Sequence, residues 1–483
     1  AAVTEFETIA RENPGDRNAR ARLIAAYLYA SRRDDAERLL RAALQKNPKD
    51  SDALLMQSEL SLQAGRYAEA QRSLQEVLRY QPESALAHYL LARTYAAGGN
   101  IMRQRQELAQ ALQLQPDLEQ ARLELARSHV EGGAPRLALE VLDKAPPSQR
   151  RGPTYAVLRN HALLSLGEHA QAAKGIAAAL AEGRTPDLLV QSAQVKLALK
   201  DYPGARAAAD EALRLDPQHV GAMGMLFRVQ VVGHKSVAAG LAALRAHAVR
   251  HPGSAAVQNY FAERLLANGQ RAEARRAFQA AKQAAPQFVE ADLALAQLDL
   301  LDGDAESARR RLASLPSPVY ERSVVRLLLA AVESRTGNQA AAAEHYRKVL
   351  EANPDSVPAL INLAYLSAEY LNRPDEALAY AQRAKELQPA NPDVGGTLGW
   401  IYYRKGIYAT ALEHLKEATS KDETATSASA ATRRYYLGLT HLKLGHQQEG
   451  LDILKRALAA SPGLPEASLA RAAIQEAAKA VSR

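Results

Sequence analysis

A proline recurs about every 34 residues along this chain, and this period restricts the fold more than any other feature. Each of these prolines follows a stretch rich in alanine and leucine, and proline ends a helix because it has no backbone N–H to donate. The prolines that mark the period are Pro14, Pro48, Pro82, Pro116, Pro217, Pro252, Pro286, Pro354 and Pro389. Because a fixed period of this length is typical of solenoids and other repeat architectures, we predict a chain of stacked repeats.

Within one period the apolar residues follow helical spacing in two halves. From Ser51 to Pro82 the first half ends at Gly65, and a small residue, Ala70, lies in the second half where two helices approach closely. Similar glycines stand at Gly99, Gly133, Gly167, Gly269, Gly303, Gly337, Gly406 and Gly445, and similar small residues at Ala36, Ala205, Ala274, Ala342, Ala377 and Ala411. Each period is therefore predicted to be an antiparallel helix pair, which cannot bury its apolar face alone and must stack on its neighbours.

These periods resemble the tetratricopeptide repeat (TPR) family, whose signature is W-x2-L-G-x2-Y, then A-x3-F, then P. The closest match occupies the family positions with Leu398, Gly399, Tyr402, Gly406, Tyr408, Ala411, Leu415 and Ala418. In the last unit Gly450 replaces the small alanine of the second helix, and we expect this departure to loosen that helix. The resemblance covers essentially the whole chain. It implies an all-α, right-handed superhelical solenoid of about thirteen TPR helix hairpins plus a terminal capping helix.

The register of the repeats suggests a division of the chain. The segment before Pro14 matches only the second helix of a unit, so we expect the native protein to extend further toward its N-terminus. The expected parts are a truncated repeat (1–14), an N-terminal TPR array (15–252) that is degenerate around 146–185 and 220–252, a C-terminal TPR array (253–418), a polar inter-repeat loop (419–431), a last TPR (432–464) and a capping helix (465–483).

Composition excludes several classes of function. The chain has no cysteine, which excludes disulfides, thiolate metal sites and cysteine nucleophiles. Its 61 basic and 53 acidic residues give a net charge of +8 that is not gathered into one basic stripe, so we expect no nucleic-acid partner. No apolar run is long enough to cross a bilayer.

Candidate catalytic and metal-binding patterns are weak, and we predict no enzyme, no cofactor and no metal. His247 and His251 are four residues apart, but no acidic residue lies near them and Pro252 ends the helix. His441 and His446 are five apart, a spacing that places two residues of one helix on different faces.

The resemblance implies a concave groove lined by the first helix of each pair. The residues expected on this groove as partner-binding positions are Tyr89, Arg93, Arg127, Tyr365, Trp400, Tyr403 and Tyr435. The last four come from adjacent units and include the only tryptophan, and aromatic side chains dominate binding hot spots. The alternative is that these aromatic residues fill gaps beside Gly395 and Gly396 in the core.

The leading hypothesis for function is a non-catalytic scaffold that binds a protein or peptide partner along this groove within a multi-protein complex. Resemblance to long bacterial TPR arrays favours a place in an envelope or export assembly, in the periplasm or at a membrane, over the cytoplasm. One alternative is the recognition segment of a larger enzyme such as a glycosyltransferase. Another is a periplasmic protein that binds polysaccharide through Trp400 and Tyr403.

Overall fold

Helices make up all the regular secondary structure in the computed structural model, which describes residues 2–12, 16–420, 427–463 and 467–481. Consecutive helices form antiparallel pairs, and within each of the two units described below the pairs stack on one another in chain order. The predicted all-α solenoid of TPR-like hairpins is therefore confirmed.

The described residues form thirteen hairpins, each with a first and a second helix. The first helices are α2 (Arg17–Tyr29), α4 (Ser51–Gln63), α6 (Ala85–Ala97), α8 (Glu119–Glu131), α10 (Pro153–Ser165), α12 (Pro186–Ala198), α14 (Val220–His234), α16 (Ala255–Ala267), α18 (Val289–Leu301), α21 (Ser323–Arg335), α23 (Val357–Glu369), α25 (Pro392–Arg404) and α27 (Ala428–Lys443). The second helices are α3 (Arg33–Lys46), α5 (Tyr67–Tyr80), α7 (Ile101–Leu114), α9 (Pro135–Asp143), α11 (His169–Glu182), α13 (Tyr202–Leu215), α15 (Val237–Arg250), α17 (Arg271–Ala284), α19 (Ala305–Ala313), α22 (Gln339–Ala352), α24 (Pro374–Leu387), α26 (Tyr408–Thr419) and α28 (Gln447–Ala460).

Four further elements complete the described chain. Helix α1 (Ala2–Glu12) packs on α2, and α29 (Ala467–Val481) packs on α28. Two short elements, the 3₁₀ turn η1 (Gln149–Arg151) and α20 (Ser317–Tyr320), precede α10 and α21.

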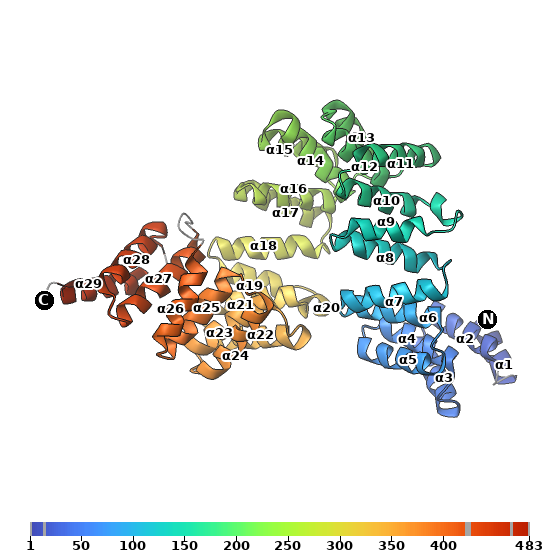
Figure 1. The fold of residues 1–483 in the computed structure, drawn as a ribbon, viewed down its shortest axis with the longest axis horizontal. Coiled ribbons are helices and arrows are strands. Elements are labelled where there is room, and N and C mark those ends of the chain that lie inside the picture. The colour runs from blue at the N-terminus through green and yellow to red at the C-terminus, as the bar shows by residue number, and fades with distance from the viewer. Residues whose placement is uncertain (1, 13–15, 421–426, 464–466, 482–483) are drawn as a thin grey trace. The chain divides into compact units, whose positions relative to one another are not determined.

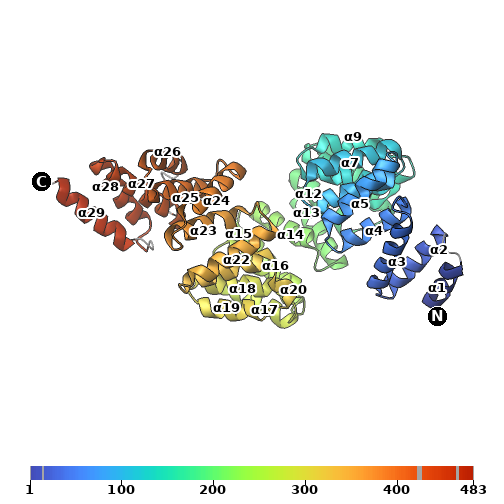
Figure 2. The same cartoon turned by 90° about the horizontal axis from the view of Figure 1, so that it is seen from below.

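The chain divides into two units, Ala1–His247 and Ala248–Arg483. Within each unit the helices lie side by side in chain order, as Figures 1 and 2 show. First helices also contact the first helices of neighbouring hairpins, as in the series α8, α10, α12 and α14 of unit 1 and α23, α25 and α27 of unit 2. Such a series presents one continuous surface made only of first helices.

The turn inside each hairpin contains one residue with a positive φ. In nine hairpins it is one of the predicted turn glycines, with φ between 71° and 87°. In the other four it is Ser31, Lys200, Lys235 or Asn372. Glycine adopts this left-handed conformation without the steric cost that a Cβ imposes, which explains why it recurs at the end of a helix. In the glycine turns the residue after the glycine donates its backbone N–H to the carbonyl five positions earlier, for example Ile407 to Tyr402 at 2.9 Å.

Small residues allow the two helices of a hairpin to approach closely. Ala36, Ala70, Ala205, Ala274, Ala342, Ala377 and Ala411 have no exposed surface. Gly450, which stands in place of this alanine in the last hairpin, lies where α27 and α28 approach closely. A Cβ at Gly450 would lie 2.9 Å from the backbone oxygen of Gly438 in α27. The two helices meet backbone to backbone at this point, with no space for an alanine.

The polar segment 419–431, predicted as a loop, is partly helical. Helix α27 begins at Ala428, and the side chain of Ser427 caps it by accepting the backbone N–H of Ala430. Ala430 and Ala431 are buried. The prediction of a loop was wrong for this part because a serine cap followed by alanines starts a helix that packing then stabilises. Residues 421–426 lie outside the described ranges.

Candidate partner-binding site

Two of the predicted groove residues, Tyr89 and Arg93, lie on α6 in unit 1. The Tyr89 hydroxyl donates a hydrogen bond of 2.8 Å to Oε1 of Glu124 on α8, so this contact ties two neighbouring first helices together. Burial, together with the hydrogen bond to the Glu124 carboxylate, raises the pKa of Tyr89 to about 12. The Arg93 guanidinium lies 5.9 Å from the centre of the Tyr89 ring. Tyr89 therefore holds a fixed position on the first-helix surface.

Arg127, the third predicted residue in unit 1, is exposed on α8 and lines a hollow of about 470 Å³. The walls of this hollow come from three successive first helices, α8, α10 and the start of α12. Its lining comprises Arg127, Val130, Glu131, Pro153, Thr154, Val157, Leu158, His161, Thr185 and Asp187. The hollow thus combines apolar side chains with charged groups on the surface that the family resemblance assigns to binding.

A second hollow, of about 440 Å³, continues along the same surface between α10, α12 and α14. His161 lines both hollows, so the two share a border on α10. The second hollow adds Leu164, Leu197, Arg228 and Val232 to the lining. We call the surface formed by these two hollows the α8–α14 groove. Sequence reasoning named Arg127 here but did not name His161 or the remaining wall residues, several of which lie in the regions around 146–185 and 220–252 that depart most from the TPR pattern.

A third hollow, also of about 470 Å³, lies on the other side of α10, against α11 and η1. Asn160 lines it with only 1% of its surface exposed, and its side-chain nitrogen has no hydrogen-bond partner. The hollow exists because α11 carries few large side chains, with alanine or glycine at most positions facing α10. The alanine-rich sequence HAQAAKGIAAALAE was the signal for this open packing.

The aromatic residues predicted for the groove of unit 2 lie mostly inside the core. Trp400 on α25 is 7% exposed, and Tyr435 on α27 is 4% exposed. Two tyrosine rings stack on the Trp400 indole, Tyr403 at 4.9 Å and Tyr436 at 4.1 Å between ring centres. The indole N–H donates to Oε1 of Glu369 at 2.7 Å. The structure thus buries Trp400 and Tyr435 in the core with little ring surface accessible, but the nearest neighbours of Gly395 and Gly396 are Ala418 and Arg433 and not these rings.

Tyr365 and Tyr403 are half-buried at the edge of this aromatic cluster. Tyr365 packs edge-on to Tyr370 at 6.2 Å. Tyr436, which sequence reasoning did not single out, makes the shortest ring contact with Trp400. Gly396 and Gly399 on α25 face aliphatic parts of side chains and not aromatic rings. A Cβ at Gly396 would lie 2.7 Å from Cγ of Arg433, and one at Gly399 would lie 2.6 Å from Cγ of Leu415.

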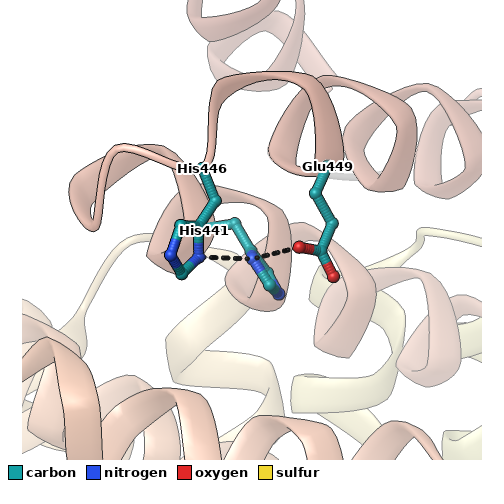
Figure 3. A group of neighbouring side chains, drawn as sticks. All are labelled: His441, His446 and Glu449. Atoms are coloured by element: carbon teal, nitrogen blue, oxygen red, sulfur yellow. Dashed lines mark hydrogen bonds and ion pairs between the residues drawn. The ribbon is translucent and has the colours of Figure 1, made fainter.

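His441 and His446, predicted on different faces of a helix, are in contact. Their Nδ1 atoms lie 3.2 Å apart, and Figure 3 shows both rings beside Glu449. The prediction was wrong because the two histidines do not share a helix. His441 lies in the last turn of α27 and His446 precedes α28, on the other side of the Gly445 turn.

A solenoid of stacked antiparallel helix hairpins places the chain in the class of helical-repeat proteins. Models described as tetratricopeptide repeat match residues 22–70, 55–119, 265–332, 324–366 and 397–465. The chain belongs to the tetratricopeptide repeat family, whose members generally act as non-catalytic scaffolds. Within the described ranges no helix combines the length and the apolar character needed to cross a membrane.

Individual proteins are similar to the chain over part or all of its length. The TPR repeat-containing protein PA4667 of Pseudomonas aeruginosa is 35% identical over 75 residues, a match that spans 16% of this chain and 13% of that protein. The crystal structure of the Cut9–Hcn1 hetero-tetramer of the APC/C is 18% identical, with coverage of 99% and 92% and a TM-score of 0.45. Yeast Tom70 is 14% identical, with coverage of 88% and 95% and a TM-score of 0.40. A tetratricopeptide repeat protein of Parabacteroides merdae is 15% identical, with coverage of 53% and 99% and a TM-score of 0.40.

Proposed function

We propose that this protein is a non-catalytic scaffold that binds a segment of a partner protein along the α8–α14 groove. The observation that carries the proposal is the pair of adjoining hollows that share His161 on four successive first helices. Repeat solenoids use extended concave surfaces made by successive repeats as their binding sites. Tyr89 and Arg93 extend the same first-helix surface onto α6.

The lining of the groove suits a peptide segment that carries apolar side chains. Val157 and Leu164 on α10 and Val232 on α14 offer apolar contacts. Arg127 and Arg228, from α8 and α14, add guanidinium groups that can donate to main-chain carbonyls or carboxylates of a peptide. Apolar anchors supply most of the affinity in such an interface, while the polar groups set register and orientation.

In unit 2 we assign only a minor role to the aromatic residues. Tyr365 and Tyr403, the half-buried members of the predicted set, would contact a partner that extends along α23 and α25. The burial of Trp400 disfavours the polysaccharide alternative, because two tyrosines already stack on the indole that a sugar ring would need. A setting in a bacterial envelope or export assembly remains part of the proposal, and the match to a Pseudomonas aeruginosa protein supports a bacterial context.

Peptide selection on the purified full chain tests this proposal directly. A peptide enriched from a random library is labelled, and its affinity is measured by fluorescence anisotropy for the wild type and for the double variant Arg127→Glu/His161→Glu. Both side chains are exposed in the groove, so the substitutions leave the core intact. We expect the double variant to weaken binding by about 30-fold, as removal of hot-spot contacts commonly does.

Lys174→Glu is the matched control, because Lys174 is an exposed residue on α11, the second helix of the hairpin that contains His161. It should bind the selected peptide as the wild type does. Equal binding by the wild type and the groove variant, or a loss confined to the Lys174 variant, would contradict the proposed site.

A further inference from the structure

Three potential metal ligands meet at the turn of the last hairpin. Nδ1 of His441 lies 3.2 Å from Nδ1 of His446 and 3.3 Å from Oε2 of Glu449. One ligand atom from each residue lies within 4.8 Å of the others. Figure 3 shows the three side chains converging, one from the end of α27 and two from the start of α28. His441 is 1% exposed, whereas His446 and Glu449 lie at the surface, so the group is open to solvent on one side.

The backbone of the turn explains why residues far from helical register meet. Gly445 has a φ of +83°, and the N–H of His446 donates to the carbonyl of His441 at 2.9 Å. This bond places the residue before the turn directly beside the residue after it. Glu449 lies in the first turn of α28, three residues after His446, so the two side chains are on the same side of that helix. Two side chains five residues apart would lie on different faces of one helix, but across this turn His441 and His446 are in contact.

The repeated turns provide an internal comparison. Nine hairpins have a glycine of positive φ at this turn. We therefore compare three equivalent positions in each of them: the residue four before the glycine, the residue directly after it and the residue four after it. At the other eight, these three places carry at most two residues among histidine, aspartate and glutamate. Two such residues occur together only at the Gly303 turn. There Asp299 forms ion pairs with arginines, and Asp304 caps α19. The full set of three at Gly445 is therefore not a requirement of the turn.

The two separations from Nδ1 of His441 fit a tetrahedral ion. Zinc binds imidazole nitrogen and carboxylate oxygen at about 2.0–2.2 Å, which places two ligand atoms of a tetrahedron about 3.4 Å apart. The observed separations of 3.2 and 3.3 Å are close to that value. Two histidines with one glutamate form a donor set that zinc and related ions favour, with one position left for water.

Hydrogen bonding alone does not satisfy this group well. A neutral imidazole carries a single N–H, yet Nδ1 of His441 faces both the Nδ1 of His446 and the Glu449 carboxylate. His446 occupies the N-cap of α28 but makes no capping hydrogen bond with its side chain. By contrast, His219 at the N-cap of α14 accepts the backbone N–H of Ala222 with Nδ1. The His446 ring is turned toward His441 instead of toward its own helix.

We propose that His441, His446 and Glu449 bind one divalent transition-metal ion of the zinc class. The ion joins the end of α27 to the start of α28 and so clamps the last hairpin. This inference is independent of partner binding in the α8–α14 groove.

The test uses the full chain without a histidine tag. Zinc affinity is measured by competition with a chromogenic chelator, and Co²⁺ serves as a spectroscopic probe because its visible absorption reports four-coordinate geometry. The variants His446→Ala and Glu449→Gln change exposed residues, and circular dichroism checks that both keep the helical fold. We expect both variants to lose about tenfold or more in affinity at this site, so that at a zinc concentration that just fills the wild-type site His446→Ala binds one ion fewer.

Gln448→Ala is the matched control, since Gln448 is exposed and adjacent to Glu449 but is not a ligand. It should bind zinc with wild-type affinity and show the wild-type Co²⁺ spectrum. The proposal is overturned if the wild type takes up no more zinc than His446→Ala, or if the Gln448 variant loses as much affinity as the ligand variants.

Discussion

The hairpin α10–α11 in unit 1 and the hairpin α25–α26 in unit 2 share one backbone plan but differ in how their surroundings are filled. Their turn glycines, Gly167 and Gly406, have nearly identical φ values of 76° and 77°. Hollows border α10 on both its groove side and its α11 side. Around α25, aromatic rings close the space against α27. The turn and the small residues thus set the repeat, while the size of the remaining side chains decides where the solenoid is open.

Truncation of the aromatic cluster should have the largest effect. Trp400→Ala removes a buried indole and its hydrogen bond to Glu369, and is expected to lower the free energy of unfolding by about 3–5 kcal/mol. Tyr155→Ala on α10 should lower the free energy of unfolding by less, because Tyr155 already borders a hollow. Urea unfolding followed by circular dichroism measures both, with the exposed Tyr29→Ala as the control. An equal cost for Trp400 and Tyr155 would show that the two regions are packed alike.

Glycines of α11 and of α28, in the hairpin that packs on α25–α26, should respond differently to an added methyl group. Gly450→Ala is expected to destabilise the protein by about 1–3 kcal/mol, because the Cβ would meet the rigid backbone of Gly438. Gly175→Ala on α11 would meet only the side-chain amide of Asn160, which borders a hollow and can move. The melting temperature of Gly450→Ala should therefore be well below that of Gly175→Ala. Gly253→Ala is the control, because a Cβ at Gly253 would have no other atom within 4 Å. The reverse ranking would break the comparison.

Filling the open region should have the smallest effect. Ala179→Leu points added volume toward the hollow between α10 and α11, and we expect the free energy of unfolding to change by no more than about 0.5 kcal/mol. Ala411→Leu makes the same change at a fully buried position of α26 and should cost about 1–3 kcal/mol. Chemical denaturation of the two variants side by side gives the difference. A large loss in the Ala179 variant would mean that the hollow is closed in solution.

Much of the fold could be predicted from the sequence because the repeat signals are local. A glycine after an amphipathic stretch predicts the turn, and all nine glycines named from the sequence have a positive φ. The positions of Ala70 and Ala274 likewise predict close helix contacts, and both are fully buried. Each of these inferences depends on a few neighbouring residues that act within one hairpin.

The candidate site was less predictable because it depends on what neighbouring hairpins supply. Arg127 was placed on the first-helix surface from its register alone, but the hollow beside it results from side chains on α10 and α12. Trp400 was expected on the groove, yet Tyr436 from the next hairpin covers it. Helical register gives the direction of a side chain and leaves open which residues of other repeats pack on it.

The sequence by itself determined the period, the hairpins and their turns, since helix propensity, glycine conformation and the stop imposed by proline act over short distances. Tertiary structure alone decided which surfaces stay open and which residues meet across a turn, as His441 and His446 do. The physical reason is that hollows and ligand clusters depend on the volumes and positions of side chains from separate helices, and these are defined only when the helices pack together.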